Sequence, residues 1–152
     1  METPILLFDD KMDKATKKIL ENVIKRKKKF DKYKQRHTLA IWGTFIPAFI
    51  YINYLYFTIA KVYSYSFAAM FSAFVKDSNN LIFLFITIGM YGWMNLLKEK
   101  MDKAEKEFHE LRCEIVDRSK DLWGTEEEWK NRHVVFELLK KNFDINLYHQ
   151  KK

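Results

Sequence analysis

The sequence predicts an all-α protein built around a membrane helical hairpin, and three observations support this fold class. Residues 39–60 and 81–97 form two apolar segments without a charged side chain. At about 1.5 Å per residue the first is long enough to cross a hydrocarbon core of about 30 Å, and the second is at the lower limit. Only four Gly and two Pro occur in 152 residues. This scarcity favours long helices over a β architecture with many turns.

Charge is distributed unevenly along the chain. Residues 1–38 contain 12 Lys and Arg against 6 Asp and Glu, whereas residues 98–152 contain 13 of each sign. The middle, residues 39–97, contains only Lys61, Lys76 and Asp77. A pair of buried helices in a soluble protein is the alternative interpretation. A buried helix in so small a protein normally keeps a polar stripe facing water, and neither apolar segment has one.

The basic flanks predict how the hairpin is oriented. A dense run of Lys and Arg over residues 25–36 precedes the first apolar segment, and four Lys between residues 98 and 106 follow the second. The positive-inside rule therefore places both termini in the cytoplasm and the connecting loop outside. Trp42 and Trp93 then fall near the cytoplasmic membrane boundary, where interfacial aromatic residues are common.

The loop itself is expected to contain a short interfacial helix. Apolar residues recur there at helical spacing: Tyr63, Phe67, Met70, Phe71 and Phe74. Such a face favours a helix lying in the outer membrane interface. A third span is the alternative, and it would place the two termini on opposite sides of the membrane.

The charged arms are predicted to form a cytoplasmic antiparallel coiled-coil stem. After the second span, apolar residues follow a heptad spacing: Leu97, Met101, Ala104, Phe108, Leu111 and Ile115. The N-terminal arm repeats the spacing with a poorer seam: Ile19, Val23, Arg26, Phe30, Tyr33 and His37. Antiparallel pairing is expected to bring Phe30 near Met101 or Ala104.

The last segment is predicted to be a helix folded back over the stem. Thr125 and Glu128 have the spacing of a capping box, and Gly124 provides the reversal. The apolar face of this helix is expected to dock on a partner or within the chain: Trp129, Phe136, Leu139 and Phe143. Residues 144–149 are predicted to be an irregular tail.

These expectations divide the chain into consecutive segments. They are a basic cytoplasmic N-terminal helix (1–38), transmembrane helix 1 (39–60), an external loop with an interfacial helix (61–80), transmembrane helix 2 (81–97), a cytoplasmic heptad helix (98–121), and a C-terminal helix and tail (122–152).

The strongest candidate binding feature is the basic run Lys25, Arg26, Lys27, Lys28 and Lys29. One interpretation is that the run acts only as a topology signal. A second is that it forms a patch that attracts anionic lipid, at about 1 kcal/mol per charge near a membrane surface. Contact with nucleic-acid phosphates is the third possibility. We do not favour it, because no motif of a nucleic-acid-binding domain accompanies the run.

Chemical motifs are weak elsewhere. His109 and Cys113 have the i, i+4 spacing of two metal ligands on a helix face. They occupy outward heptad positions and no second pair completes a ligand set, so no metal or cofactor is expected. No serine lies in a nucleophile motif, which predicts a protein that is not an enzyme. Within the spans, Gly89 and Gly92 are expected to allow close helix approach.

Two stretches resemble the YpbF-like family of small membrane proteins from Bacillus-type bacteria. The first is Asp13-Lys-Ala-Thr-Lys-Lys-Ile-Leu-Glu-Asn-Val-Ile continuing to Lys29-Phe30-Asp31. The second runs from Leu122-Trp123 through Trp129 to Phe143-Asp144-Ile145-Asn146-Leu147. The resemblance implies two spans and a location in the bacterial cell (inner) membrane. It implies no activity or mechanism.

Two function classes follow from these patterns. The first is a non-enzymatic membrane-anchored scaffold or interaction protein, with anionic lipids and an unidentified membrane or cytoplasmic protein as partners. The alternative is a small transport or ion-permeation component formed by oligomerised spans, in which Asn53, Thr87 and Asn95 line a path. No Asp, Glu, Lys or Arg lies inside either span, which argues against ion coupling.

Overall fold

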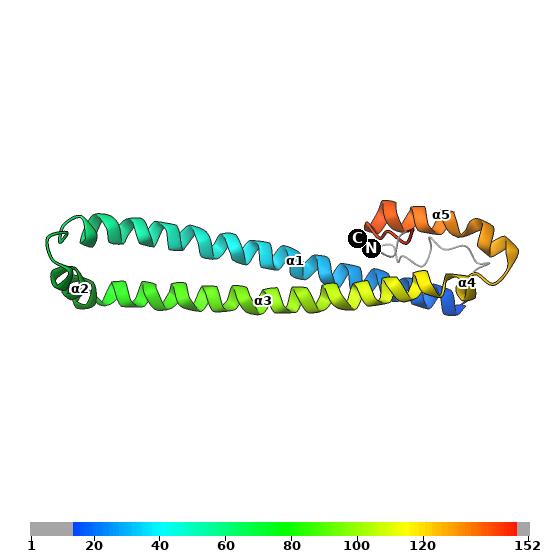
Figure 1. Cartoon of the computed structure of the whole chain (residues 1–152), viewed down its shortest axis with the longest axis horizontal. Helices are drawn as coiled ribbons and strands as arrows, with labels where there is room; N and C mark the ends of the chain where they lie inside the picture. Colours follow the sequence, from blue (N-terminus) through cyan, green and yellow to red (C-terminus); the bar gives the residue numbers. More distant parts are fainter. Residues whose placement is uncertain (1–13, 149–152) are drawn as a thin grey trace. The chain divides into compact units, whose positions relative to one another are not determined.

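A computed structural model describes residues 14–148, and every regular element in that range is helical (Figure 1). In chain order the elements are α1 (Lys14–Leu55), η2 (Tyr56–Ala60), α2 (Phe67–Lys76), α3 (Ser78–Asp117), α4 (Ser119–Leu122) and α5 (Glu126–Phe143). The all-helical prediction is confirmed. The described residues divide into two compact units, a charged unit of residues 14–32 and 101–148 and an apolar unit of residues 33–100.

In the apolar unit, α1 and α3 lie side by side and run in opposite directions (Figure 1). Near one end, the Thr44 hydroxyl donates to the Met90 carbonyl at 3.4 Å. Near the other, the Tyr51 hydroxyl donates to the Asn80 carbonyl at 2.8 Å. The acceptor on α3 moves from residue 90 back to residue 80 as the donor on α1 moves from residue 44 to residue 51, so the two helices are antiparallel.

Helix α1 passes directly into one turn of π-helix, η2, before the chain turns. The Lys61 N–H donates to the Tyr56 carbonyl at 2.9 Å, which is the i→i−5 bond of a π-helix. Helical structure therefore ends at Ala60, the residue at which the sequence predicted the first apolar span to end.

The short helix expected in the connecting loop is present as α2. Ser66 caps it, because its side chain accepts a hydrogen bond from the Ala69 N–H. Four members of the predicted apolar face, Phe67, Met70, Phe71 and Phe74, line a cleft of about 420 Å³ between α2 and the end of α1 with η2. The fifth, Tyr63, lies in the turn before α2 and does not line it. The position of α2 in a membrane interface stays a prediction.

The charged unit has a hydrophobic core assembled from all of its segments. The buried members are Leu20, Val23, Ile24, Phe108, Ile115, Trp123, Phe136, Leu139, Ile145 and Leu147. Here α1 runs antiparallel to α3 and the α4 helix that follows it, because Thr16 bonds the Leu122 carbonyl of α4 while Arg26 bonds the Glu107 carbonyl of α3. Helix α3 ends at Asp117, and the short helix α4 follows in place of the last turn expected up to residue 121.

A contact between two aromatic rings marks the pairing of α1 with α3 in the charged unit. The ring of Phe30 stacks on the ring of Phe108 with centroids 6.4 Å apart. Phe108 lies one helical turn beyond Ala104, the more distant of the two partners expected for Phe30. Residues Leu20 and Ile24, which the heptad pattern left outside the seam, are 0% and 2% exposed. A third layer covers this second face of α1, which a two-helix heptad pattern does not include. The expected proximity of Phe30 to Met101 or Ala104 stays a prediction.

That third layer is α5 with the chain that follows it. Both hydrogen bonds of the predicted capping box are present, from the Glu128 N–H to the Thr125 hydroxyl and from the Thr125 N–H to the Glu128 carboxylate. At the other end, Asp144 adopts the left-handed conformation at φ 55°. The chain then buries Ile145 and Leu147 in the core. The tail is irregular as predicted through Tyr148, and His149 lies outside the described residues.

Candidate functional site

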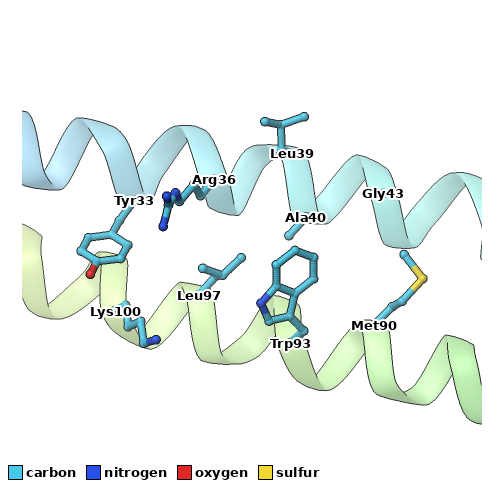
Figure 2. Close-up of a pocket in the computed structure, with 9 residues that line it drawn as sticks. All are labelled: Tyr33, Arg36, Leu39, Ala40, Gly43, Met90, Trp93, Leu97 and Lys100. Carbon is cyan, nitrogen blue, oxygen red and sulfur yellow. The ribbon is translucent and has the colours of Figure 1, made fainter.

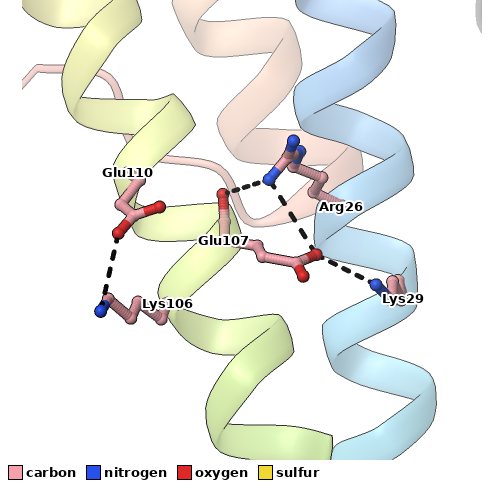
Figure 3. Close-up of polar contacts among 5 residues, drawn as sticks. All are labelled: Arg26, Lys29, Lys106, Glu107 and Glu110. Atoms are coloured by element: carbon pink, nitrogen blue, oxygen red, sulfur yellow. Dashed lines mark hydrogen bonds and ion pairs between the residues drawn. The ribbon is translucent and has the colours of Figure 1, made fainter.

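The basic run is engaged largely within the charged unit. Figure 3 shows Glu107 of α3 between two basic side chains of α1. Its Oε2 atom lies 3.0 Å from Nζ of Lys29 and 4.0 Å from Nη1 of Arg26. The hydrogen bond from Lys29 holds the pKa of the Glu107 carboxyl below its usual value, and the charges of Lys29, Arg26 and Lys103 act in the same direction, against a smaller opposing effect of desolvation.

Lys27 is the buried member of the run, with 9% of the residue exposed. Its Nζ atom lies 3.2 Å from Asp31 Oδ1 and 3.6 Å from Asp144 Oδ2. The same ammonium lies 5.6 Å and 5.7 Å from the ring centroids of Phe30 and Phe108. Two carboxylates and two aromatic rings therefore compensate this charge, and one of the carboxylates belongs to the cap of α5.

The remaining members of the run are more accessible. Lys28 is exposed and lies over the ring of Phe143, with its Nζ atom 5.4 Å from the centroid. Lys25 is exposed as well. The structure thus gives Arg26, Lys27, Lys28 and Lys29 contacts inside the charged unit. Contact of the run with anionic lipid stays a prediction.

The face predicted on the C-terminal helix packs within the chain. Phe136 and Leu139 are 6% and 1% exposed and belong to the hydrophobic core. The ring of Phe136 meets Trp123 edge to face at a centroid distance of 5.3 Å. Trp129 and Phe143 are partly buried against the same core. A protein partner that docks on Phe136 and Leu139 would have to displace these contacts.

His109 and Cys113, the two residues considered as metal ligands, are both half-buried on α3. His109 Nε2 lies 3.6 Å from Glu105 Oε1, and the His109 ring contacts Phe108. Between residues 14 and 148, no group of three or more His, Cys, Asp or Glu is placed to hold a metal ion.

The polar residues that join the helices of the apolar unit are not the ones singled out from the sequence. Asn53 donates to the Phe49 carbonyl and Thr87 to the Phe83 carbonyl, each on its own helix at 2.8 Å. Three others make contacts between elements: Thr44, Tyr51 and Asn80. Asn80 is 2% exposed, and its Nδ2 donates to the Phe74 carbonyl at 3.3 Å. Hydroxyls and amides recur throughout these segments, so the sequence alone gives no signal that selects this set.

The expectation that Gly89 and Gly92 allow close approach of the two helices is wrong within a single chain. A Cβ atom added at either position would meet nothing within 4 Å. Close approach of α3 to α1 therefore does not require a glycine at these two positions.

Sequence reasoning also missed a cleft of about 400 Å³ between α1 and α3 in the apolar unit, shown in Figure 2. Its lining residues are Tyr33, Arg36, Leu39, Ala40, Gly43, Met90, Trp93, Leu97 and Lys100. Arg36, Tyr33 and Lys100 gather at one end, and Gly43 and Met90 lie at the other (Figure 2). A signal for this site was available, since Arg36 and Lys100 each lie three residues outside a charge-free segment.

These features define a class of protein in which two long apolar helices continue into a charged helical unit that has its own core. The chain belongs to the family described as "Protein of unknown function (DUF2663)", whose family model matches residues 19–150. It is similar to the "Uncharacterized protein YpbF" of Bacillus subtilis (strain 168), with 31% identity over 145 residues that cover 95% of each chain. The YpbF-like resemblance is thereby confirmed. No solved structure matches the chain.

Proposed function

We propose that this protein is a two-span component of a bacterial cell membrane, with both termini in the cytoplasm and α2 outside. The main support is the exposure of its most apolar segments. Both long helices contain an 18-residue stretch apolar enough to cross a membrane, and only 11% of each stretch is buried inside the protein. A core helix of a soluble protein would be mostly buried. Large side chains such as Phe45 and Phe85, each 70% exposed, instead suit a lipid environment.

The role we propose is that of a non-enzymatic scaffold. Helices α1 and α3 each continue from the apolar unit into the charged unit without a break. The charged unit has its own hydrophobic core, so it is a folded module in its own right. Such an arrangement supports display of the module at the membrane surface, where it recruits or braces another protein.

Reporter fusions test the topology. A reporter that is active only outside the cytoplasm should be silent when fused at Lys152 and active when inserted near Ser78. Activity at Lys152 would refute the two-span arrangement and favour the three-span alternative.

In-cell photo-crosslinking tests the scaffold role. A photoreactive residue at the exposed position Glu137 of α5 should capture a distinct protein. The matched control is the same probe at Phe85, which the proposal places in lipid and which should capture little of that protein. Equal capture from both positions, or none from further exposed sites on the charged unit, would contradict the proposal.

The alternative, transport through oligomerised spans, has less support. The side-chain donors of Asn53 and Thr87 are engaged by carbonyls of their own helices, which leaves fewer polar donors for a permeation path. Ion flux through vesicles reconstituted with the purified full chain would favour this alternative over the scaffold.

A further inference from the structure

We propose that the cleft between Arg36 and Met90 binds one anionic phospholipid of the membrane. Its phosphate group is held by Arg36 and Lys100, and an acyl chain lies along Gly43 and Met90. This inference rests on the proposed membrane insertion and adds a specific lipid site to it. The site is separate from the basic run at residues 25–29, because all of its lining residues belong to the apolar unit.

The first support is the charge at one end of the cleft. The nine described residues that line it include two bases, Arg36 and Lys100, and no acid. They come from different helices, and the antiparallel arrangement brings them to the same end (Figure 2). A guanidinium and an ammonium on opposite walls suit a phosphate, which accepts hydrogen bonds from both kinds of donor.

The second support is the change in polarity along the cleft. Beyond the two bases the lining becomes apolar, and Ala40, Gly43 and Met90 belong to the segments without charge. The proposed membrane boundary therefore lies between the basic end and the apolar end. Trp93 lines the cleft near this boundary, as amphipathic rings do at the headgroup level. Phosphate at one end and hydrocarbon at the other is the polarity of a phospholipid.

The third support is the space at Gly43. A Cβ atom added there would meet nothing within 4 Å, although Gly43 lines the cleft. The missing side chain therefore leaves space rather than allowing a tight helix contact. This gives a selective variant: Gly43→Leu places a side chain in the cleft without a clash at its Cβ. Gly89→Leu is the matched control, because its Cβ is also unobstructed and Gly89 does not line the cleft.

The experiment reconstitutes the full chain in phosphatidylcholine vesicles that contain a small proportion of a photoreactive lipid. The probe is phosphatidylglycerol or phosphatidylcholine with the photoreactive group in the acyl chain, and mass spectrometry maps the labelled residues. We expect phosphatidylglycerol to label Met90 and its neighbours about thirtyfold more than phosphatidylcholine, the preference that two basic side chains confer at a membrane surface. Equal labelling by the two lipids would refute the proposal.

Substitutions test the basic end and the apolar end of the cleft independently. Arg36→Gln with Lys100→Gln should remove the preference for phosphatidylglycerol, whereas Lys32→Gln with Lys98→Gln, an equal change in charge outside the cleft, should leave it. Gly43→Leu should reduce labelling by both lipids, and Gly89→Leu should not. A loss of preference in both charge pairs would mean general surface attraction and would refute a specific site.

Two further measurements show which proposal a negative result refutes. Inorganic phosphate should not displace the lipid, and if it abolishes the preference the cleft binds free phosphate rather than a membrane lipid. Extraction of the vesicles with alkaline carbonate measures insertion separately. A chain that is extracted refutes both the membrane proposal and this one, whereas a chain that stays inserted without a lipid preference refutes only the cleft.

Discussion

The Nζ atom of Lys29 on α1 donates a hydrogen bond to Oε2 of Glu107 on α3 at 3.0 Å. Arg26 of α1 donates to the backbone carbonyl of the same glutamate at 3.1 Å. Both the side chain and the main chain of Glu107 therefore accept from the basic run. Since the run is the densest charge cluster in the sequence, this pairing lets the charged unit fold with part of that charge compensated.

The Glu107 contacts predict a dependence of stability on acid. Because the folded state lowers the pKa of Glu107 below its ordinary 4.5, its contribution is fully present above that value. The contribution is lost as the pH falls through the lowered pKa. Glu107→Gln should therefore flatten the acid side of the stability profile. Urea unfolding of the full chain in detergent micelles, followed by tryptophan fluorescence from pH 7 to about pH 3, measures this, because Trp123 is buried in the core of the charged unit.

The control for this profile is Glu110→Gln. Glu110 pairs with Lys106 of its own helix at 4.0 Å, and both side chains are exposed. An equal loss of acid dependence in the two variants would show that Glu107 has no special role.

Lys27 is predicted to tolerate loss of its charge and not its reversal. Its carboxylate partners Asp31 and Asp144 are 44% and 95% exposed at their side chains, so water can solvate them without the lysine. Lys27→Met should change the free energy of unfolding by less than about 1 kcal/mol, because an apolar side chain of similar length suits a buried position beside the rings of Phe30 and Phe108. Lys27→Glu places a third negative charge in a buried position and should cost more than about 3 kcal/mol.

Chemical denaturation of both variants in micelles measures whether Lys27→Glu lowers the free energy of unfolding more than Lys27→Met. Lys25→Glu, at an exposed position of the same run, should cost little. A Lys27→Met variant as unstable as Lys27→Glu would show that the ion pairs themselves hold the fold.

The irregular segment after α5 is predicted to be part of the core. Leu147 is 2% exposed although it lies in no helix. Leu147→Ala should destabilise the charged unit by about 2–5 kcal/mol, as for other buried leucines. Val134→Ala, at a site 47% exposed on α5, should change stability by less than about 0.5 kcal/mol. Protease resistance of the variants in membranes distinguishes them, and equal resistance would contradict a core role.

Tyr51 is predicted to link α1 to the start of α3. Its hydroxyl donates to the Asn80 carbonyl at 2.8 Å, so Tyr51→Phe removes one hydrogen bond between helices. Such bonds within membrane helix bundles contribute about 0.6 kcal/mol on average. Unfolding in detergent mixtures should show a loss of about this size, with Tyr54→Phe, at a residue 42% exposed, as the control. A larger effect of Tyr54→Phe would contradict the assignment.

Patterns local to the chain predicted most of the fold. Periodicity and the absence of charge predicted the long apolar helices, and the end of helix at Ala60 matches the end of the first charge-free segment. Thr125 and Glu128 predicted the start of α5, because a capping box depends only on residues three apart. The candidate site was not predicted, because a cleft depends on how the side chains of α1 and α3 pack, and the predicted antiparallel pairing does not say where such packing leaves space beside Arg36 and Lys100.

The sequence by itself determined the family, the helical class and the segregation of charge from apolar surface, because composition and spacing of neighbouring residues decide these properties. Tertiary structure decided which residues share the core. Ile145 and Leu147 are buried by a reversal after Asp144, and Leu20 and Ile24 are buried because the C-terminal layer completes the same core. Such burial depends on contacts between segments more than a hundred residues apart, and no local period in the sequence encodes them.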